Sequence, residues 1–277
     1  MLLVLFLGSI FCIYALNREL NKGILTVVFL NIGQGDSIYI ESPTHNQMLI
    51  DGGPGKSVLR ELGKVMPFYD RHLDVVLATH PDADHVGGLN DVLDKYKVDL
   101  FLEPGADAPT EIYKNLEQKV DEYVKNGKIT KILARRGMIV DLGGGAVFQI
   151  FFPDQDVAGW ETNDASIVGR LVYGNNEFLL NGDSPQRIEK YLISLNTPLE
   201  SDVLKAGHHG SRTSSSKEFV AAVHPQYAVI SAGLNNRYGH PHKEVLDILN
   251  SLGIETLRTD TQGRITFKSD GQNLRLK

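Results

Sequence analysis

Cysteine is almost absent from this sequence, and the single residue, Cys12, excludes an internal disulfide and a metal cluster built on thiolates. Basic residues are in the minority, with 28 Lys and Arg against 34 Asp and Glu, a formal net charge of −6. This balance does not suggest a general polyanion binder, although it leaves room for a local basic face. The 277 residues also contain no low-complexity linker and no repeat with a period of roughly 20–50 residues. We therefore expect one globular domain rather than two.

The first sixteen residues, MLLVLFLGSIFCIYAL, carry no charge. This stretch is shorter than the roughly 20 residues of a typical membrane span. It also lacks the basic start and the A-x-A-like cleavage site of a signal peptide, because no Lys or Arg precedes Arg18. We interpret residues 1–22 as a hydrophobic membrane anchor or signal-like segment, with a first strand or helix buried in the domain as the alternative. The protein is then membrane-anchored or secreted, and residues 24–277 form an extracytoplasmic domain.

Strand patterns dominate the chain from residue 25 onward. Runs of apolar and β-branched residues predict strands at 25–33, 37–42, 47–53, 73–79, 98–104, 129–133, 138–142, 146–152, 166–174, 176–183, 202–207, 227–233 and 265–268. Helical patterns occur at 56–66, 110–126, 185–195, 216–223 and 243–252, and residues 86–96 are predicted to be a loop that runs into a helix. Two β-rich halves with helices interspersed predict two sheets that pack face to face and are covered by helices on the outside.

The stretch THPDADHVGGL (79–89) places two histidines and two aspartates, His80, Asp82, Asp84 and His85, within six positions directly after a strand. Open α/β layers bind their ligands at such strand ends. Neutral imidazole and carboxylate are ordinary ligands of Zn, Mn or Fe. The alternative is an acidic loop whose aspartates cap the next helix. Four ligand-type side chains on so short a segment favour a metal site.

Three later stretches add candidate ligands and substrate contacts. LLNGDSP (179–185) ends a strand with Asp183, and LKAGHHGSRTSSS (204–216) places His208 and His209 at another strand end. Adjacent side chains on an extended chain point in opposite directions, so we expect only one of this pair to meet the metal. NNRYGHPH (235–242), which contains His240, supplies cations and hydrogen-bond donors suited to a negatively charged substrate.

Together with FLNIGQGDSIYI and LIDGG, these motifs resemble those of the metallo-β-lactamase fold, in the branch formed by ComEC-type competence proteins. The resemblance runs from about residue 25 to residue 268. It implies an α/β fold, the αβ/βα four-layer sandwich, with the metal site at one edge between the two sheets. It also implies one or two divalent metal ions, Mn or Zn. In family terms a first position is formed by His80 and Asp82, a second by Asp84, His85 and His208, and Asp183 bridges them.

The sequence departs from the wider superfamily at the first position. The superfamily carries histidine where this chain has Asp82, and it has a further histidine ligand before Asp183. No histidine occurs from 86 to 207, and Asn163 stands near the expected place. The competence branch shares these features. The first position is therefore predicted to be weaker and harder in character than the second.

The predicted activity is that of a metal-dependent hydrolase. A bound metal ion makes water a nucleophile near neutral pH and stabilises the developing oxyanion. We expect Asp82, Asp84 and His240 to be catalytic. Serines 211 and 214–216, with backbone N–H groups before the 216–223 helix, are expected to bind phosphate oxygens. The predicted substrate contacts are Lys205, His209, Ser211, Arg212, Asn163 and His240.

These contacts favour a phosphodiester, and the resemblance points to DNA: a nuclease in competence-type DNA uptake, within a DNA-uptake complex. Because the fold alone does not determine the function, two alternatives stay open. One is hydrolysis of a small ester, lactone or lactam. The other is an inactive metal-binding module that docks onto a transport complex.

Overall fold

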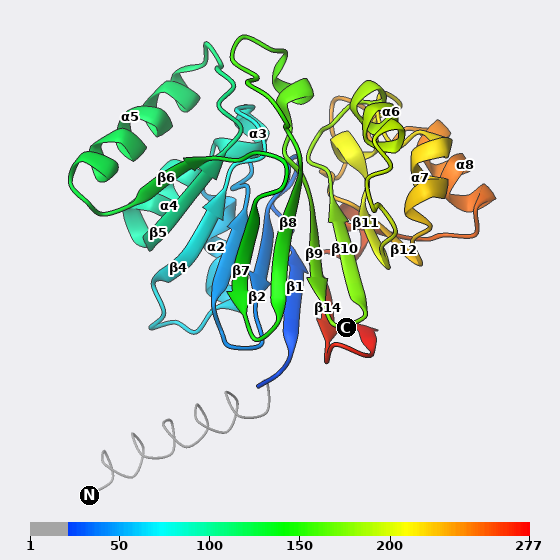
Figure 1. The fold of residues 1–277 in the computed structure, drawn as a ribbon, viewed down its shortest axis with the longest axis horizontal. Coiled ribbons are helices and arrows are strands. Elements are labelled where there is room, and N and C mark those ends of the chain that lie inside the picture. Colours follow the sequence, from blue (N-terminus) through cyan, green and yellow to red (C-terminus); the bar gives the residue numbers. More distant parts are fainter. Residues whose placement is uncertain (1–21) are drawn as a thin grey trace, which may run out of the picture.

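The computed structural model describes residues 22–277, so the predicted N-terminal anchor lies outside the described residues. Among the helices formed within residues 22–277, none combines the length and the apolar character needed to cross a membrane. The described part of the chain contains two mixed β-sheets that pack against each other, with helices on the outer faces (Figure 1).

The two sheets hold the strands in a nearly sequential spatial order. The first sheet, in the order β15-β14-β1-β2-β3-β4-β5-β6, comprises β1 (Leu25–Phe29), β2 (Ile38–Glu41), β3 (Gln47–Ile50), β4 (His72–Leu77), β5 (Lys97–Glu103), β6 (Thr130–Leu133), β14 (Ile265–Ser269) and β15 (Leu274–Leu276). The second, in the order β13-β12-β11-β10-β9-β8-β7, comprises β7 (Ile139–Gly143), β8 (Ala146–Phe152), β9 (Val168–Tyr173), β10 (Asn176–Leu180), β11 (Val203–Lys205), β12 (Tyr227–Ile230) and β13 (Glu255–Arg258).

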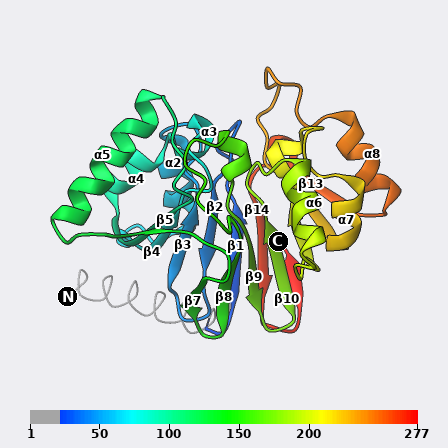
Figure 2. The ribbon, with the colours of Figure 1, turned by 45° about the horizontal axis from the view of Figure 1, so that its top comes forward.

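Helices cover the outer face of each sheet (Figure 2). Those on the first sheet are α2 (Ser57–Val65), α3 (Ala83–Val86), α4 (Leu89–Lys95) and α5 (Glu111–Lys125). Those on the second are α6 (Gln186–Ser194), α7 (Lys217–Val223) and α8 (Lys243–Ser251). Short helical turns complete the chain at η1 (Thr162–Ala165), η2 (Gly207–Gly210) and α9 (Thr259–Gln262). The predicted two-sheet sandwich with outer helices is confirmed.

Alternation of side chains along the strands explains this layering, because each strand presents one set to the space between the sheets and the other to the helices. Phe29, Phe178 and Phe267 belong to the cluster between the sheets, and the Phe178 and Phe267 ring centroids lie 5.8 Å apart. Two further apolar clusters lie beneath the helices, one on each outer face. The central strands are therefore apolar on both sides, which is typical of sheets buried on both faces.

The strand directions bring several loops to one edge of the sandwich. In the first sheet β3, β4, β5 and β6 run parallel to one another, and in the second β10, β11, β12 and β13 do so. Parallel strands end at the same edge of a sheet, and ligands bind outside those ends. The loops after β3, β4, β10, β11 and β12 consequently surround one site.

Glycines allow two of these loops to interlock. The Gly52 N–H donates to the His85 carbonyl at 2.6 Å, and the Gly88 N–H donates to the Gly53 carbonyl at 2.8 Å. A Cβ atom at Gly88 would lie 2.3 Å from the Gly52 oxygen. The loop after β3 therefore presses directly on the turn that carries His85.

We predict that Gly88→Ala lowers the free energy of unfolding by at least about 2 kcal/mol, because backbone atoms on both sides of the new methyl group cannot easily move apart. Gly63→Ala is the matched control, since it lies within α2 and a Cβ there meets no atom within 4 Å. Removing this helical glycine should stabilise the protein by about 0.5–1 kcal/mol. Urea unfolding of both variants tests the pair, and equal effects would contradict the prediction.

Candidate metal centre

His85 is held in a fixed orientation by a carboxylate behind it. Its Nδ1 lies 2.8 Å from Asp51 Oδ2, and the ring is fully buried. Asp51 in turn accepts hydrogen bonds from the backbone N–H and the hydroxyl of Thr79, at 2.8 and 2.7 Å. Because Nδ1 donates to Asp51, Nε2 is the atom that His85 would offer to a metal ion, and it faces Asp183 Oδ2 at 3.3 Å. This arrangement is that of a carboxylate-oriented histidine ligand.

His80 is oriented in the same manner by Thr79. The Thr79 hydroxyl gives its proton to Asp51, so its oxygen accepts from His80 Nδ1 at 3.0 Å. His80 Nε2 then faces the site, 3.6 Å from Asp82 Oδ2. Asp82 stands at the N-cap of α3 but makes no side-chain capping hydrogen bond. The helix-capping alternative for this aspartate is therefore not what the structure contains.

The paired histidines lie in a sharp turn rather than on extended chain. His208 and His209 both have left-handed backbone conformations, with φ of 49° and 54°. His209 is buried, its Nδ1 lies 3.0 Å from the Ser231 carbonyl, and its Nε2 lies 3.3 Å from both Asp84 Oδ2 and Asp183 Oδ2. His208 is 28% exposed, and its Nδ1 lies 3.0 Å from Thr213 Oγ1.

This geometry corrects the expectation for the pair. His209 joins the ligand cluster, whereas His208 Nε2 lies farther away, 3.8 Å from Asp183 Oδ2. The ligand role that we expected for His208 therefore fits His209, and the substrate-facing position expected for His209 fits His208. The turn reverses the assignment because its left-handed residues direct the second ring, not the first, towards the interior.

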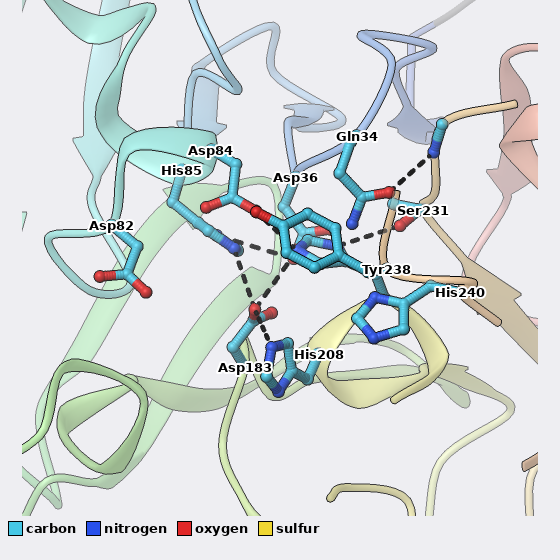
Figure 3. A network of polar contacts seen from close by, with 12 residues as sticks. Gln34, Asp36, Asp82, Asp84, His85, Asp183, His208, Ser231, Tyr238 and His240 are labelled. Carbon is cyan, nitrogen blue, oxygen red and sulfur yellow. Dashed lines mark hydrogen bonds and ion pairs between the residues drawn. The ribbon is translucent and has the colours of Figure 1, made fainter. Parts of the chain in front are cut away.

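Asp183 occupies the centre of the cluster and uses its two oxygens differently (Figure 3). Oδ2 faces the rings of His85 and His209, while Oδ1 lies 3.4 Å from the Lys205 ammonium. Lys205 also donates to the Gly182 carbonyl at 2.8 Å and forms an ion pair with Asp36. Asp36 was not predicted as a site residue; its carboxylate lies 3.4 Å from His209 Nδ1.

The side chains present fit a divalent cation. Within residues 22–277, the buried atoms without a hydrogen-bond partner include Nε2 of His80, His85 and His209, and Oδ1 of Asn163. Unpaired buried polar atoms are rare in proteins, and a bound ion is among their ordinary explanations. Asp36, His85, Asp183 and His209 alone bring four ligand atoms within 4.8 Å of one another. Imidazole nitrogens beside carboxylates form a donor set suited to Zn, Mn or Fe.

The charges in the cluster also favour a bound cation. Burial alone would lower the pKa of His209, but Asp183 and Asp36 raise it well above its ordinary value. Burial likewise opposes protonation of His85, yet Asp183 and Asp51 raise the pKa of that ring. The carboxylates thus create a negative potential strong enough to favour buried cations, which is the potential that a metal ion would neutralise.

A buried glutamate braces the turn that carries His209. Glu189 on α6 accepts from the backbone N–H groups of Ser215 and Ser216 at 2.5 and 2.9 Å. Ser215 also has a left-handed backbone, and its hydroxyl oxygen accepts from the Gly207 N–H at 3.0 Å. Because α6 follows Asp183 in the chain, Glu189 ties the loop of one ligand to the loop of another.

Two predicted substrate contacts are corrected by this arrangement. Lys205 is only 1% exposed and forms ion pairs with Asp36 and Asp183, so it cannot reach a phosphate. Ser211 is buried with its hydroxyl 3.0 Å from Thr213 Oγ1. The N–H groups before α7, expected to bind phosphate, are occupied by Glu189.

The other predicted contacts lie nearer the opening. Arg212 is exposed, His240 is half-buried, and Asn163 lies on η1 with its amide oxygen buried. The His240 ring centroid lies 5.5 Å from that of His208 and 5.6 Å from that of Tyr238. Figure 3 shows Tyr238 and His240 at the front of the cluster.

A model of the metallo-beta-lactamase superfamily matches residues 30–233. The chain belongs to this superfamily. Among its relatives, ComE operon protein 3 of Bacillus subtilis (strain 168) is 31% identical over 260 residues, which cover 87% of this chain and 33% of that protein. Competence protein ComA of Neisseria gonorrhoeae is 30% identical over 252 residues, with coverage of 89% and 32%. Recombination protein 2 of Haemophilus influenzae is 27% identical over 258 residues, with coverage of 91% and 30%.

The resemblance to competence proteins is thereby confirmed, and the chain spans about a third of the length of these relatives. Solved structures share the metallo-beta-lactamase fold. A diphosphatase from the PhnP family is 14% identical with a TM-score of 0.51, covering 88% of this chain and 98% of that one. A long-form RNase Z from yeast is 13% identical with a TM-score of 0.51, covering 79% and 38%. At these identities the likeness shows the fold alone.

We predict a pH-dependent effect of Glu189→Gln on stability. Burial raises the pKa of Glu189 to about 7, against an ordinary value of 4.5, although the Ser216 and Ser215 N–H groups oppose this. Because the pKa is raised in the folded state, the contribution of Glu189 to folding stability is complete below about pH 4.5 and is lost as the pH rises towards 7. Glutamine cannot ionise. Between pH 4.5 and 8, the free energy of unfolding of the variant should therefore rise relative to that of the wild type by on the order of 3 kcal/mol.

Urea unfolding of metal-free protein at several pH values measures this difference in unfolding free energy. The control is Glu218→Gln, an exposed glutamate in the first turn of α7, which should show no trend with pH. Parallel pH profiles for the wild type and Glu189→Gln would refute the prediction.

Proposed function

We propose that the domain is a metal-dependent phosphodiesterase that cleaves DNA during competence-type DNA uptake. The observation that carries the proposal is the convergence of three imidazole Nε2 atoms without hydrogen-bond partners, those of His80, His85 and His209, beside the buried carboxylate of Asp183. A site of this kind is the usual basis of hydrolysis at a phosphoryl centre. The family membership supports hydrolysis, and the relatives named for competence and recombination support DNA as the substrate.

The ligands divide into two positions that share Asp183. The second position consists of Asp84, His85 and His209, and the first of His80, Asp82 and Asn163. A divalent ion held there would lower the pKa of a water molecule and stabilise charge that develops on the scissile group. The side chains of Asp82 and Asp84 are 37% and 32% exposed, so we propose that each also orients the attacking water through an oxygen that faces the opening.

Residues at the opening would contact the substrate. His240 and His208 stand side by side there, and the exposed Arg212 follows the same turn. We propose that His240 and His208 donate hydrogen bonds to the phosphodiester and that Arg212 contacts a neighbouring phosphate. This local set of donors and cations compensates for the acidic balance of the whole chain.

We further propose that the domain works on the extracytoplasmic side of a membrane, within a DNA-uptake complex. The support is the likeness to proteins about three times as long, one of which is named as a competence protein. Residues 1–22 would supply an attachment to the membrane.

We predict that Mn²⁺ supports activity better than Zn²⁺ and that the second position binds metal more tightly than the first. The second position has two carboxylates and two imidazoles, whereas the first relies on a neutral amide oxygen in place of a histidine. Carboxylate-rich sites suit Mn²⁺, while Zn²⁺ prefers nitrogen and sulfur ligands in a closed tetrahedron. Two tightly held zinc ions in the wild type, with no gain from manganese, would contradict this prediction.

Paired histidine variants test the same assignment. His209→Ala should lose metal and activity together, because its ring belongs to the second position. His208→Ala should keep the wild-type metal content and lose activity only. Metal content by mass spectrometry, combined with nuclease rates, measures both. The reverse pattern would return the ligand role to His208.

We predict that Arg212→Ala weakens cleavage of single-stranded DNA about tenfold, while hydrolysis of bis(4-nitrophenyl) phosphate changes less than about twofold. A cation on a remote phosphate adds binding energy only when that phosphate exists. The assay includes a chromogenic carboxylic ester, so faster hydrolysis of the ester than of both phosphodiesters would refute the proposed function itself. The control is Lys125→Ala, an exposed cation at the end of α5, which should leave all three rates unchanged.

A further inference from the structure

Gln34 lies in the loop between β1 and β2, wedged between two loops of the site. On one side, the Asp36 N–H donates to the Asp84 carbonyl at 3.2 Å, and a Cβ atom at Gly35 would lie 2.1 Å from that same oxygen. On the other side lies Gly233, in the loop after β12. A Cβ atom at Gly233 would lie 2.8 Å from the backbone nitrogen of Gln34. The backbone of Gln34 is therefore confined between the turn of Asp84 and the loop after β12.

A hydrogen bond fixes the orientation of the Gln34 amide. The Gly233 N–H donates to Gln34 Oε1 at 3.1 Å. A backbone N–H can only donate, so the atom that faces it must be the amide oxygen and not the amide nitrogen. Nε2 is consequently directed away from Gly233, and Figure 3 shows it on the side of Asp36 and Tyr238.

The amide nitrogen of Gln34 lacks an acceptor. Nε2 is buried and has no hydrogen-bond partner in the described part of the chain. Leaving a buried donor unpaired is unfavourable, and a bound ligand is one explanation for such a group. The Asp36 carboxylate on the same side does not accept from Gln34 Nε2: its Oδ2 pairs with Lys205, and its Oδ1 lies 3.4 Å from His209 Nδ1. An oxygen atom of a bound molecule would satisfy it.

We propose that Gln34 binds a phosphoryl oxygen of the substrate through Nε2, as a fixed donor beside the metal positions. This inference rests on the proposed phosphodiesterase function and names a residue that would stabilise negative charge on the reacting group. A donor held in place before the substrate arrives needs no reorganisation, which is why such donors are effective for charge that develops during reaction. The Gly233 hydrogen bond supplies that fixed position.

Two substitutions separate this role from the alternatives. Gln34→Glu keeps an oxygen that accepts from Gly233 and removes the donor, but it adds a charge. Gln34→Met removes the donor without adding a charge, but it also removes the acceptor. Weakening in both variants identifies the donor, weakening in Gln34→Met alone identifies a structural anchor, and weakening in Gln34→Glu alone identifies charge repulsion.

The measurement is the affinity for inorganic phosphate of manganese-loaded protein, by calorimetry, with metal content and unfolding midpoint determined in parallel. Both variants should bind phosphate at least about tenfold more weakly than the wild type at unchanged metal content. Gln118→Glu, exposed on α5, is the control for added charge and should bind as the wild type does. Wild-type affinity in either Gln34 variant would overturn the proposal.

Turnover of bis(4-nitrophenyl) phosphate distinguishes this inference from the function on which it rests. Wild-type protein that binds phosphate through Gln34 but hydrolyses no phosphodiester would refute the proposed function and leave the donor role of Gln34 supported. Active wild-type protein with unchanged phosphate binding in Gln34→Met would refute the donor role alone.

Discussion

The buried carboxylate of Asp183 is the group on which the site depends. Its Oδ2 faces imidazoles contributed by both halves of the sandwich, and its Oδ1 is compensated by Lys205. A carboxylate at 2% exposure is unfavourable unless it is paired and hydrogen-bonded. His209, His85 and Lys205 outweigh the effect of burial and hold the pKa of Asp183 well below its ordinary value. The two imidazoles and the Lys205 ammonium ion thus keep the Asp183 carboxylate charged before any metal ion binds.

Much of the fold and part of the site follow from local sequence signals. Apolar runs locate most strands, and the dense motif at 80–85 and Asp183 stand at strand ends, where parallel sheets bind ligands. Strands β13 and β15 were not predicted, because ETLR and LRL are short and mix polar with apolar residues. Their strand conformation is determined by pairing with neighbours, which a local pattern does not contain.

The misassigned site residues share one physical cause, namely that long-range contacts decide burial and direction. The sequence predicts Lys205 as a cation at the rim of the site. In the structure it is buried and forms an ion pair with Asp36, which is far away in the sequence. The expectation for His208 assumed extended chain, whereas the turn is left-handed at both histidines. The serine-rich segment was predicted to bind an anion, but its Ser215 and Ser216 N–H groups donate to the carboxylate of Glu189 on α6. In each case the residue type indicated a polar or charged role, but a local sequence pattern does not identify the distant residue with which it pairs.

The chain passes between the two sheets at both edges of the sandwich. Residues 134–138 connect β6 to β7, the edge strands on one side, and residues 259–264 return from β13 to β14, which pairs with β1 in the first sheet. These covalent connections limit how far the two sheets can separate near either edge. The halves that carry His85 and His209 can slide only as far as the packed aromatic core between them allows. The separation of the two halves of the candidate metal site is therefore a property of the core, set at a distance from the ligands themselves.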